Sequence, residues 1–255
     1  DNPWGDTLRK WRTQGMPTQP DGVLVDAAEH FGYDMVPCGG GFRWQALEDE
    51  VVEETESWKI VRNGNGAMHK WWTSRSGTPE HVAFDMTSRR VWEERYRPHL
   101  VSGFRERVGD PEKVKARIAR RRQQGKWTSF GNRFVWENLR SSLGDENMFL
   151  ALADDPDWIH DFNRVYTDLY KNCYSILFEE AGLPDGIWIY EDLGYRDRLF
   201  CSPGMLRQLF FPYYAELIDF LHGYDLPVVF HSCGFQEPMI PLVIEAGADA
   251  INPMQ

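Results

Sequence analysis

The stretch Ile187-Trp-Ile-Tyr-Glu-Asp-Leu-Gly194 decides the fold, together with the segment that follows it. The run Ile187–Tyr190 is apolar and short, which predicts a buried strand, and Glu191–Gly194 is expected to form a loop. Ser202-Pro203 then predicts a helix start, because serine is a favoured N-cap and proline a favoured first helical residue. We expect this helix to extend to about His222, with a kink at Pro212.

The same alternation continues to the end of the sequence. Leu226–Phe230 predicts a second apolar strand, Pro238–Glu245 a helix that ends at Gly247, and Ala250–Pro253 the start of another strand. Strands that alternate with helices over short connections are typical of βαβ units, so the sheet is expected to be parallel and the fold class α/β. Ligands of such folds bind at the carboxyl ends of the strands.

Two further strands are expected nearer the N-terminus, which makes five candidates in all, near residues 34–37, 127–130, 187–190, 226–230 and 249–253. Helices are expected between them. These are Val23–Phe31, Trp92–Leu100, Pro111–Gln124, Phe134–Leu143, Asn147–Ala153 and Asp157–Glu180.

The segment Glu50–Met86 has a different sequence pattern, typical of antiparallel strands. Ser57–Arg62 and Ala67–Thr73 alternate around Asn63-Gly-Asn-Gly66, which predicts an antiparallel β-hairpin with a glycine-rich turn. His81–Phe84 is a candidate third strand. We therefore expect an antiparallel β-hairpin lobe inserted at residues 50–86.

Composition restricts the classes of function. The chain has 255 residues, a mass of 29.8 kDa and a net charge of −11, so general binding to nucleic acid is not expected. No apolar run reaches the roughly 18–20 residues of a membrane span, and the 4 cysteines are too sparse for a disulfide framework. A reducing, cytoplasmic setting is expected. The basic segment Lys113–Arg122 is either a solvated helix face or a docking patch for an acidic partner.

Several residues directly after the strands are candidates for binding a cofactor. Glycines at these positions let a ligand approach the backbone closely, and polar or aromatic neighbours supply contacts. The candidates are Gly39, Gly40, Phe42, Gly131 and Asn252.

His231 and Cys233 end one strand with a spacing of two, which puts both side chains on one face. Imidazole nitrogen and thiolate sulfur both suit zinc, although a catalytic zinc site takes about three protein ligands. The alternative is a buried cysteine beside a hydrogen-bonding histidine.

Glu191 and Asp192 are adjacent, so at most one of them faces a pocket in a regular strand. That acid is a candidate catalytic residue, acting as a metal ligand, a general base or the partner of a cation. The alternative is a salt bridge or a helix N-cap.

An ordered series of motifs carries a resemblance to a known family. The motifs are Asp185–Gly194, Ser202-Pro203, Pro212-Tyr-Tyr214, Phe230-His-Ser-Cys-Gly234 and Glu245–Pro253. The chain resembles the uroporphyrinogen decarboxylase superfamily, in particular the branch related to cobamide-dependent methyltransferases. This resemblance implies a (β/α)₈ TIM barrel with its site at the C-terminal mouth.

In that branch a His-x-Cys pair and a later cysteine bind zinc, and the zinc holds a substrate thiol as the thiolate. The thiolate attacks a methyl group on a corrinoid (cobalamin) cofactor, usually carried by a partner protein. The resemblance thus implies that His231 and Cys233 are ligands, with the third ligand expected after Gln255.

Two other functions remain open, a porphyrinogen decarboxylase-like carboxy-lyase and a non-catalytic tetrapyrrole or corrinoid binder. The family's decarboxylases carry an aspartate where this chain has Cys38-Gly39, which argues against decarboxylation. Five strands cannot close a barrel. We therefore expect residues 1–255 to be a single but partial TIM-barrel domain, with one strand before Asp1 and two after Gln255.

Overall fold

The computed structural model describes residues 3, 5–18, 27–39, 41–75 and 77–254. Its larger sheet has five strands in the order β1-β6-β7-β8-β9, and every neighbouring pair is parallel. The strands are β1 (Met35–Pro37), β6 (Trp127–Arg133), β7 (Gly186–Glu191), β8 (Val228–Ser232) and β9 (Ala250–Asn252). All five expected strands and their parallel arrangement are confirmed. In the described residues this sheet is open, and they do not form a complete barrel.

The register of this sheet aligns a row of polar and aromatic residues near the carboxyl ends of the strands. Arg133 on β6 pairs with Tyr190 on β7, Tyr190 pairs with His231 on β8, and His231 pairs with Asn252 on β9. Because parallel strands all end at the same edge, residues that are far apart in the chain become neighbours there.

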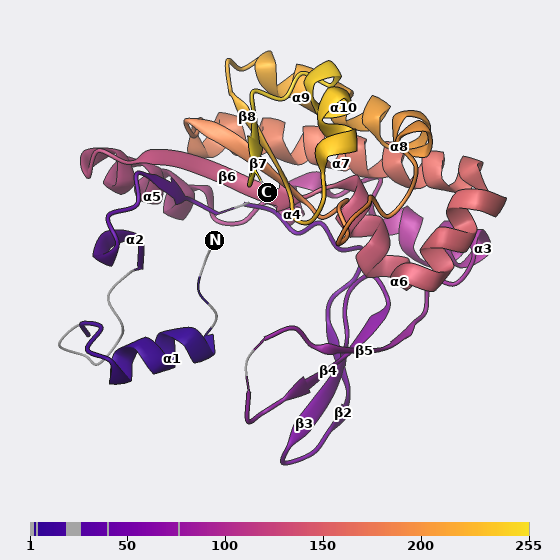
Figure 1. Ribbon diagram of the computed structural model, residues 1–255, viewed down its shortest axis with the longest axis horizontal. Coiled ribbons are helices and arrows are strands. Elements are labelled where there is room, and N and C mark those ends of the chain that lie inside the picture. The colour runs from indigo at the N-terminus through magenta and orange to yellow at the C-terminus, as the bar shows by residue number, and fades with distance from the viewer. Residues whose placement is uncertain (1–2, 4, 19–26, 40, 76, 255) are drawn as a thin grey trace.

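Long helices cover one side of the parallel sheet, as Figure 1 shows for α7 and α9. Large apolar side chains on this side, such as Phe130, Ile187 and Phe230, are fully buried in one continuous core. The helices that follow the strands are α5 (Pro111–Gln123), α6 (Val135–Asp154), α7 (Pro156–Ala181), α8 (Pro203–Leu209), α9 (Phe211–His222) and α10 (Ile240–Glu245).

The helical chain is interrupted at two places where the sequence predicted a boundary or a kink. The helices expected at Phe134–Leu143 and Asn147–Ala153 are both present within α6, on either side of a break at Gly144, whose φ is 74°. The Cβ of a larger residue there would collide with the ring of Phe84, so the glycine lets the helix bend where the smaller sheet packs against it. The expected kink near Pro212 is confirmed, because the chain leaves helical geometry at Phe210, between α8 and α9.

The shorter elements show where local patterns were misleading. Trp92–Tyr96 is a π-helical turn and Arg97–His99 a 3₁₀ turn, where one regular helix was predicted over Trp92–Leu100. Pro98 lacks a backbone N–H, which disfavours a continuous α-helix at this point. The remaining elements are α1 (Gly5–Thr13), α2 (Ala27–His30), α3 (Arg89–Val91), α4 (Phe104–Arg107) and a 3₁₀ turn at Glu237–Met239. Of the helix predicted over Val23–Phe31, residues 23–26 lie outside the described residues.

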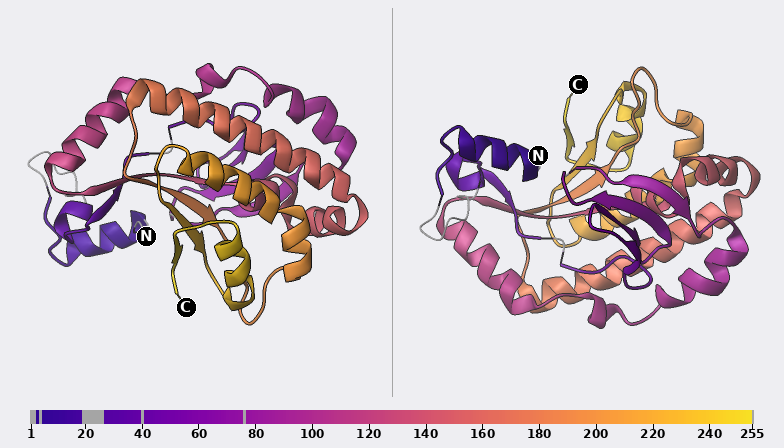
Figure 2. Two further views of the ribbon diagram at one scale, coloured as in Figure 1. Left: turned by 90° about the horizontal axis from the view of Figure 1, so that it is seen from above. Right: turned by 90° about the horizontal axis from the view of Figure 1, so that it is seen from below.

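Residues 50–84 form the predicted lobe, a separate antiparallel sheet of four strands in the order β2-β3-β4-β5. Figure 2 shows this lobe in front of the parallel sheet when the molecule is seen from below. The hairpin and the third strand are confirmed, whereas β2 was not predicted because Glu50-Val-Val-Glu-Glu54 does not alternate and is exposed throughout. The strands are β2 (Glu50–Glu54), β3 (Trp58–Arg62), β4 (Ala67–Trp72) and β5 (Glu80–Phe84).

The lobe is held to the helices by Asn65, a fully buried residue in its glycine-rich turn. The Asn65 amide donates hydrogen bonds to the hydroxyls of Ser142 (2.9 Å) and Tyr166 (2.7 Å). Its Oδ1 accepts one from the backbone N–H of Ala46 (2.9 Å). One polar side chain therefore joins the lobe to α6, α7 and the segment before β2.

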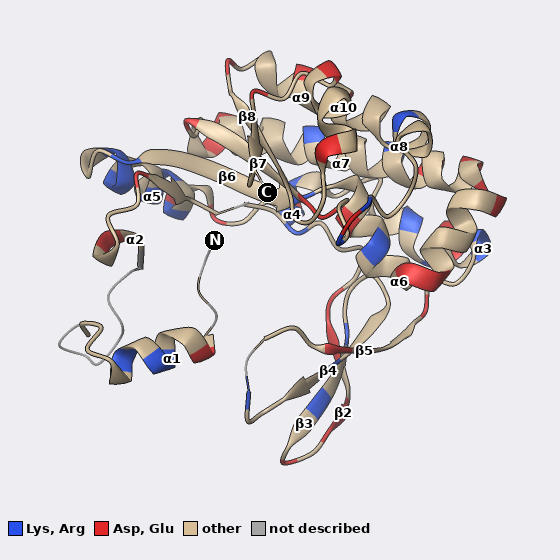
Figure 3. Ribbon diagram, in the orientation of Figure 1, with Lys and Arg blue, Asp and Glu red and all other residues tan. Residues whose placement is uncertain are grey.

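The basic segment Lys113–Arg122 lies on α5, where Figure 3 shows several cationic residues. Its charges are partly paired within the chain. Arg122 bonds Asp185 at 2.6 Å, Arg121 contacts Glu29 at 3.3 Å and Lys113 lies 3.5 Å from Asp110.

Among the described residues, none of the helices combines the length and the apolar character that crossing a bilayer requires.

Candidate metal centre and adjoining cavities

His231 is near the carboxyl end of β8, and its side chain is oriented by the neighbouring strand. Its Nδ1 donates a hydrogen bond of 2.8 Å to Oδ1 of Asn252 on β9, the residue it pairs with in the sheet. This bond fixes the tautomer, so that Nε2 carries a free lone pair. His231 is 8% exposed, which limits the directions that Nε2 can face.

Two other potential ligands lie close to Nε2 of His231. The Sγ of Cys233 is 3.4 Å away and Oδ1 of Asp192 is 3.9 Å away. The backbone N–H of Cys233 donates to the same Asp192 oxygen at 2.9 Å, which holds the carboxylate against the cysteine. All three ligand atoms lie within 4.8 Å of one another. One nitrogen, one sulfur and one oxygen are the donors that zinc takes in proteins, and three protein ligands suit a catalytic site.

Of the two adjacent acids, only Asp192 belongs to this group. The Glu191 side chain is buried, and its Oε2 accepts a hydrogen bond of 2.7 Å from the backbone N–H of Glu137 in the first turn of α6. Burial, and then the charge of Glu137, raise the pKa of Glu191 well above its usual value. Glu191 therefore bonds the first turn of α6, while Asp192 faces His231 and Cys233 in the candidate metal centre.

Two of the residues predicted to bind a cofactor, Gly131 and Phe42, pack against aromatic rings. A Cβ on Gly131 would lie 2.5 Å from the Tyr190 ring, so this glycine makes room for that ring. The Phe42 ring packs edge-on against Tyr170 and Tyr174, with centroids 5.0 Å apart in both cases. Gly39 has a φ of 98° and adjoins Arg117. Gly40 lies outside the described residues. Asn252 contacts the candidate metal centre through its hydrogen bond with His231.

A small cavity of about 190 Å³ lies directly against the candidate metal centre. Its lining residues come from the ends of β6, β7 and β8 and from the start of α6. They are Arg133, Glu137, Tyr190, Glu191, Asp192 and His231.

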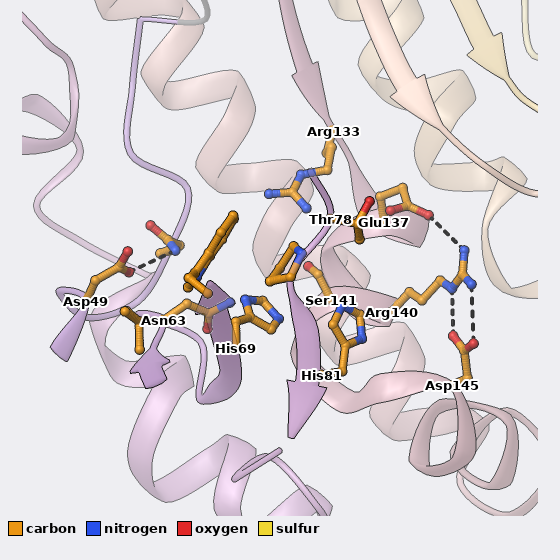
Figure 4. A pocket seen from close by; sticks show the side chains of 14 residues that line it. Asp49, Asn63, His69, Thr78, His81, Arg133, Glu137, Arg140, Ser141 and Asp145 are labelled. Carbon is orange, nitrogen blue, oxygen red and sulfur yellow. Dashed lines mark hydrogen bonds and ion pairs between the residues drawn. The ribbon is translucent and has the colours of Figure 1, made fainter. Parts of the chain in front are cut away.

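A larger cavity of about 520 Å³ lies between the lobe and α6, and it shares Arg133 and Glu137 with the small cavity. Figure 4 shows Arg133, His69 and His81 around this space, which we call the lobe chamber. Its other lining residues are Gln45, Asp49, Val61, Asn63, Trp71, Thr78, Pro79, Glu137, Arg140, Ser141 and Asp145.

Sequence reasoning did not find Arg133 or the lobe chamber. The strand was predicted to end at Phe130, but β6 continues to Arg133, which is therefore the true strand-end residue. Extending the strand by three residues would have pointed to Arg133. His69 and His81 had no recognisable spacing, because they meet only through the pairing of β4 with β5.

Comparisons with known proteins agree with the fold. A methyltransferase from Methanosarcina mazei is similar in structure, with a TM-score of 0.57 and 16% sequence identity. The match covers 88% of this chain and 58% of that chain, so this chain spans little more than half the length of the methyltransferase. No protein-family model matches the sequence. No curated protein matches it either. The chain therefore has a methyltransferase-like fold.

Proposed function

We propose that this protein is a zinc-dependent methyltransferase that moves a methyl group between a corrinoid and a thiol or similar acceptor. The main support for this proposal is that Asp192, His231 and Cys233 lie close together at the carboxyl edge of the parallel sheet. The fold shared with a methyltransferase supports the reaction class. The corrinoid, supplied by a partner protein, is carried over from the family resemblance.

Each residue of the site has a definable task in this proposal. His231, Cys233 and Asp192 would hold zinc, and the Asn252 side chain keeps the His231 lone pair available by holding the proton on Nδ1. Bound zinc lowers the pKa of a coordinated thiol, so that the thiolate persists at neutral pH. Tyr190 and Arg133 line the small cavity beside the centre, where an acceptor can approach.

Metal analysis of the purified chain tests the proposal. We expect about one zinc per chain, and a loss of affinity of more than about 100-fold in His231→Ala and in Cys233→Ala. Cys201→Ala is the matched control, because burial raises the pKa of Cys201 to about 12 and keeps that thiol protonated. Equal zinc binding in all three variants would overturn the assignment of the ligands.

The same preparation distinguishes the remaining alternatives. A chain that binds no zinc but releases CO₂ from an acidic tetrapyrrole would be a carboxy-lyase. Tight corrinoid binding that survives His231→Ala and is not followed by methyl transfer would indicate a non-catalytic binder. Zinc-dependent transfer of a methyl group from methylcobalamin to a thiol is the result that the proposal expects.

A further inference from the structure

The two faces of the lobe sheet differ in how their tryptophans are used. On one face, the Lys70 ammonium lies 4.3 Å from the ring centre of Trp58 and 4.6 Å from that of Trp72. Trp71 is on the opposite face, since successive residues of a strand alternate, and it lines the lobe chamber. Within the described ranges, Trp71 has no aromatic or cationic ring partner, and it is 40% exposed. A large aromatic surface thus faces the lobe chamber.

Two imidazoles extend this aromatic wall. His69 and His81 are paired across β4 and β5, with ring centres 4.8 Å apart and planes inclined by 31°. Burial, followed by the proximity of His81 and Arg133, lowers the pKa of His69, so this ring is neutral at pH 7. The Nε2 of His69 is buried without a hydrogen-bond partner. Flat rings of this kind favour a planar aromatic ligand over a flexible aliphatic one.

The opposite wall of the lobe chamber carries an exposed arginine, Arg133. The Arg133 guanidinium lies 4.6 Å above the ring of Trp44 and makes no ion pair with any residue that the structure describes. By contrast, Arg140 forms two hydrogen bonds with Asp145, of 2.6 and 3.2 Å. The carboxylate of Asp49 accepts from the backbone N–H of Gly64 at 3.0 Å. Arg133 is therefore the arginine of this chamber that no described carboxylate pairs with, and it is the cation to which a ligand acid can bind.

We propose that the lobe chamber binds a small aromatic acid, with its ring against Trp71 and the imidazole pair and its carboxylate on Arg133. The volume of about 520 Å³ is within the usual range for small-molecule sites. A planar guanidinium can hold a carboxylate through two parallel hydrogen bonds, which fixes the orientation of the ring. The shared wall of Arg133 and Glu137 places this ligand beside the candidate metal centre. The inference adds a ligand class that the proposed methyl transfer does not assign, and binding of this ligand needs no metal.

Calorimetry with metal-free protein and 4-methoxybenzoate tests this assignment. Cyclohexanecarboxylate keeps the acid but has no flat ring, and methoxybenzene keeps the ring but has no acid. We expect 4-methoxybenzoate to bind, and each of the other two molecules to bind at least about tenfold more weakly. Equal binding of all three molecules, or no binding of 4-methoxybenzoate at millimolar concentration, would overturn the proposal.

Substitutions locate the binding. Trp71→Leu, which keeps an apolar side chain but removes the flat ring, and Arg133→Gln should each weaken binding about tenfold. Trp58→Leu, on the other face of the lobe, and Arg75→Gln, beside Trp72, are the matched controls and should bind like the unmodified chain. Unchanged binding in both Trp71→Leu and Arg133→Gln would refute the assigned location, and thermal melts confirm that each variant is folded.

A separate variant distinguishes failure of this inference from failure of the proposed function. His231→Ala should lose zinc and keep its affinity for 4-methoxybenzoate, because His231 lies outside the lobe chamber. Loss of 4-methoxybenzoate binding in His231→Ala would place the ligand at the candidate metal centre and contradict the inference. Absence of zinc from the unmodified chain, with 4-methoxybenzoate still bound, would contradict the proposed function alone.

Discussion

The parallel sheet and the lobe hold their functional side chains by different means. In the parallel sheet, neighbouring strands are packed on helices through one continuous apolar core, and His231 is positioned by the register of β8 with β9. In the lobe, strand β2 is exposed along its whole length, and the contact with the helices includes a buried hydrogen-bond network around Asn65. Many weak apolar contacts tolerate a local change, whereas one buried polar network does not.

The largest effect is therefore expected from Asn65→Leu. This change leaves the Ala46 N–H and the two hydroxyls of Ser142 and Tyr166 without their partner, and should cost about 3 kcal/mol of unfolding free energy. Denaturant unfolding measures it. Asn147→Leu, which removes one bond to the Leu143 carbonyl, is the control and should cost less than about 1 kcal/mol. Similar losses in both variants would show that the lobe does not depend on Asn65.

A smaller effect is expected where the parallel sheet orients the candidate metal centre. Asn252→Leu removes the acceptor for His231 Nδ1 without removing a ligand, so zinc affinity should fall about 10–100-fold, or roughly 1.4–2.7 kcal/mol. Competition with a chelator measures this affinity. Asn172 donates a hydrogen bond to the Asp168 carbonyl within α7. Its replacement, Asn172→Leu, is the control and should leave the zinc affinity unchanged. An unaffected affinity in Asn252→Leu would mean that the sheet register does not tune the site.

The smallest effect concerns the buried acid beside the centre. Because the pKa of Glu191 is raised in the folded chain, its carboxyl group contributes most stability at low pH, and this contribution is lost as pH rises from the unfolded pKa through the folded one. Glu191→Gln removes that dependence, and should raise the unfolding free energy on the order of 1 kcal/mol at pH 8 but not at pH 4.

Thermal unfolding between pH 4 and pH 8 measures the difference in stability between Glu191→Gln and the unmodified chain. The protein is treated with EDTA so that bound metal does not contribute. The exposed Glu53→Gln on β2 serves as the control and should show no such trend. A Glu191→Gln variant that is less stable at pH 8 than the unmodified chain would contradict the raised pKa.

The parallel sheet was predictable because its strands are short apolar runs separated by helix starts with strong local signals, such as Ser202-Pro203. Elements without such signals were missed. Strand β2 consists of exposed residues, and β6 extends past Phe130 into Gly-Asn-Arg133, where the sequence has no apolar pattern. The π-helical turn at Trp92–Tyr96 is likewise invisible in sequence, since it depends on how Trp92 and Tyr96 are buried.

The sequence by itself determined the alternation of strands and helices, the spacing that puts His231 and Cys233 on one face, and the opposite directions of Glu191 and Asp192. Only the tertiary structure decided that Asp192 is the acid beside His231, that Asn252 orients the imidazole, and that Arg133 lines the same cavity as the histidines of the lobe. The physical reason is that local propensity and periodicity act over a few residues. Contacts between strand ends and a distant hairpin depend on sheet register and on burial, which no short segment encodes.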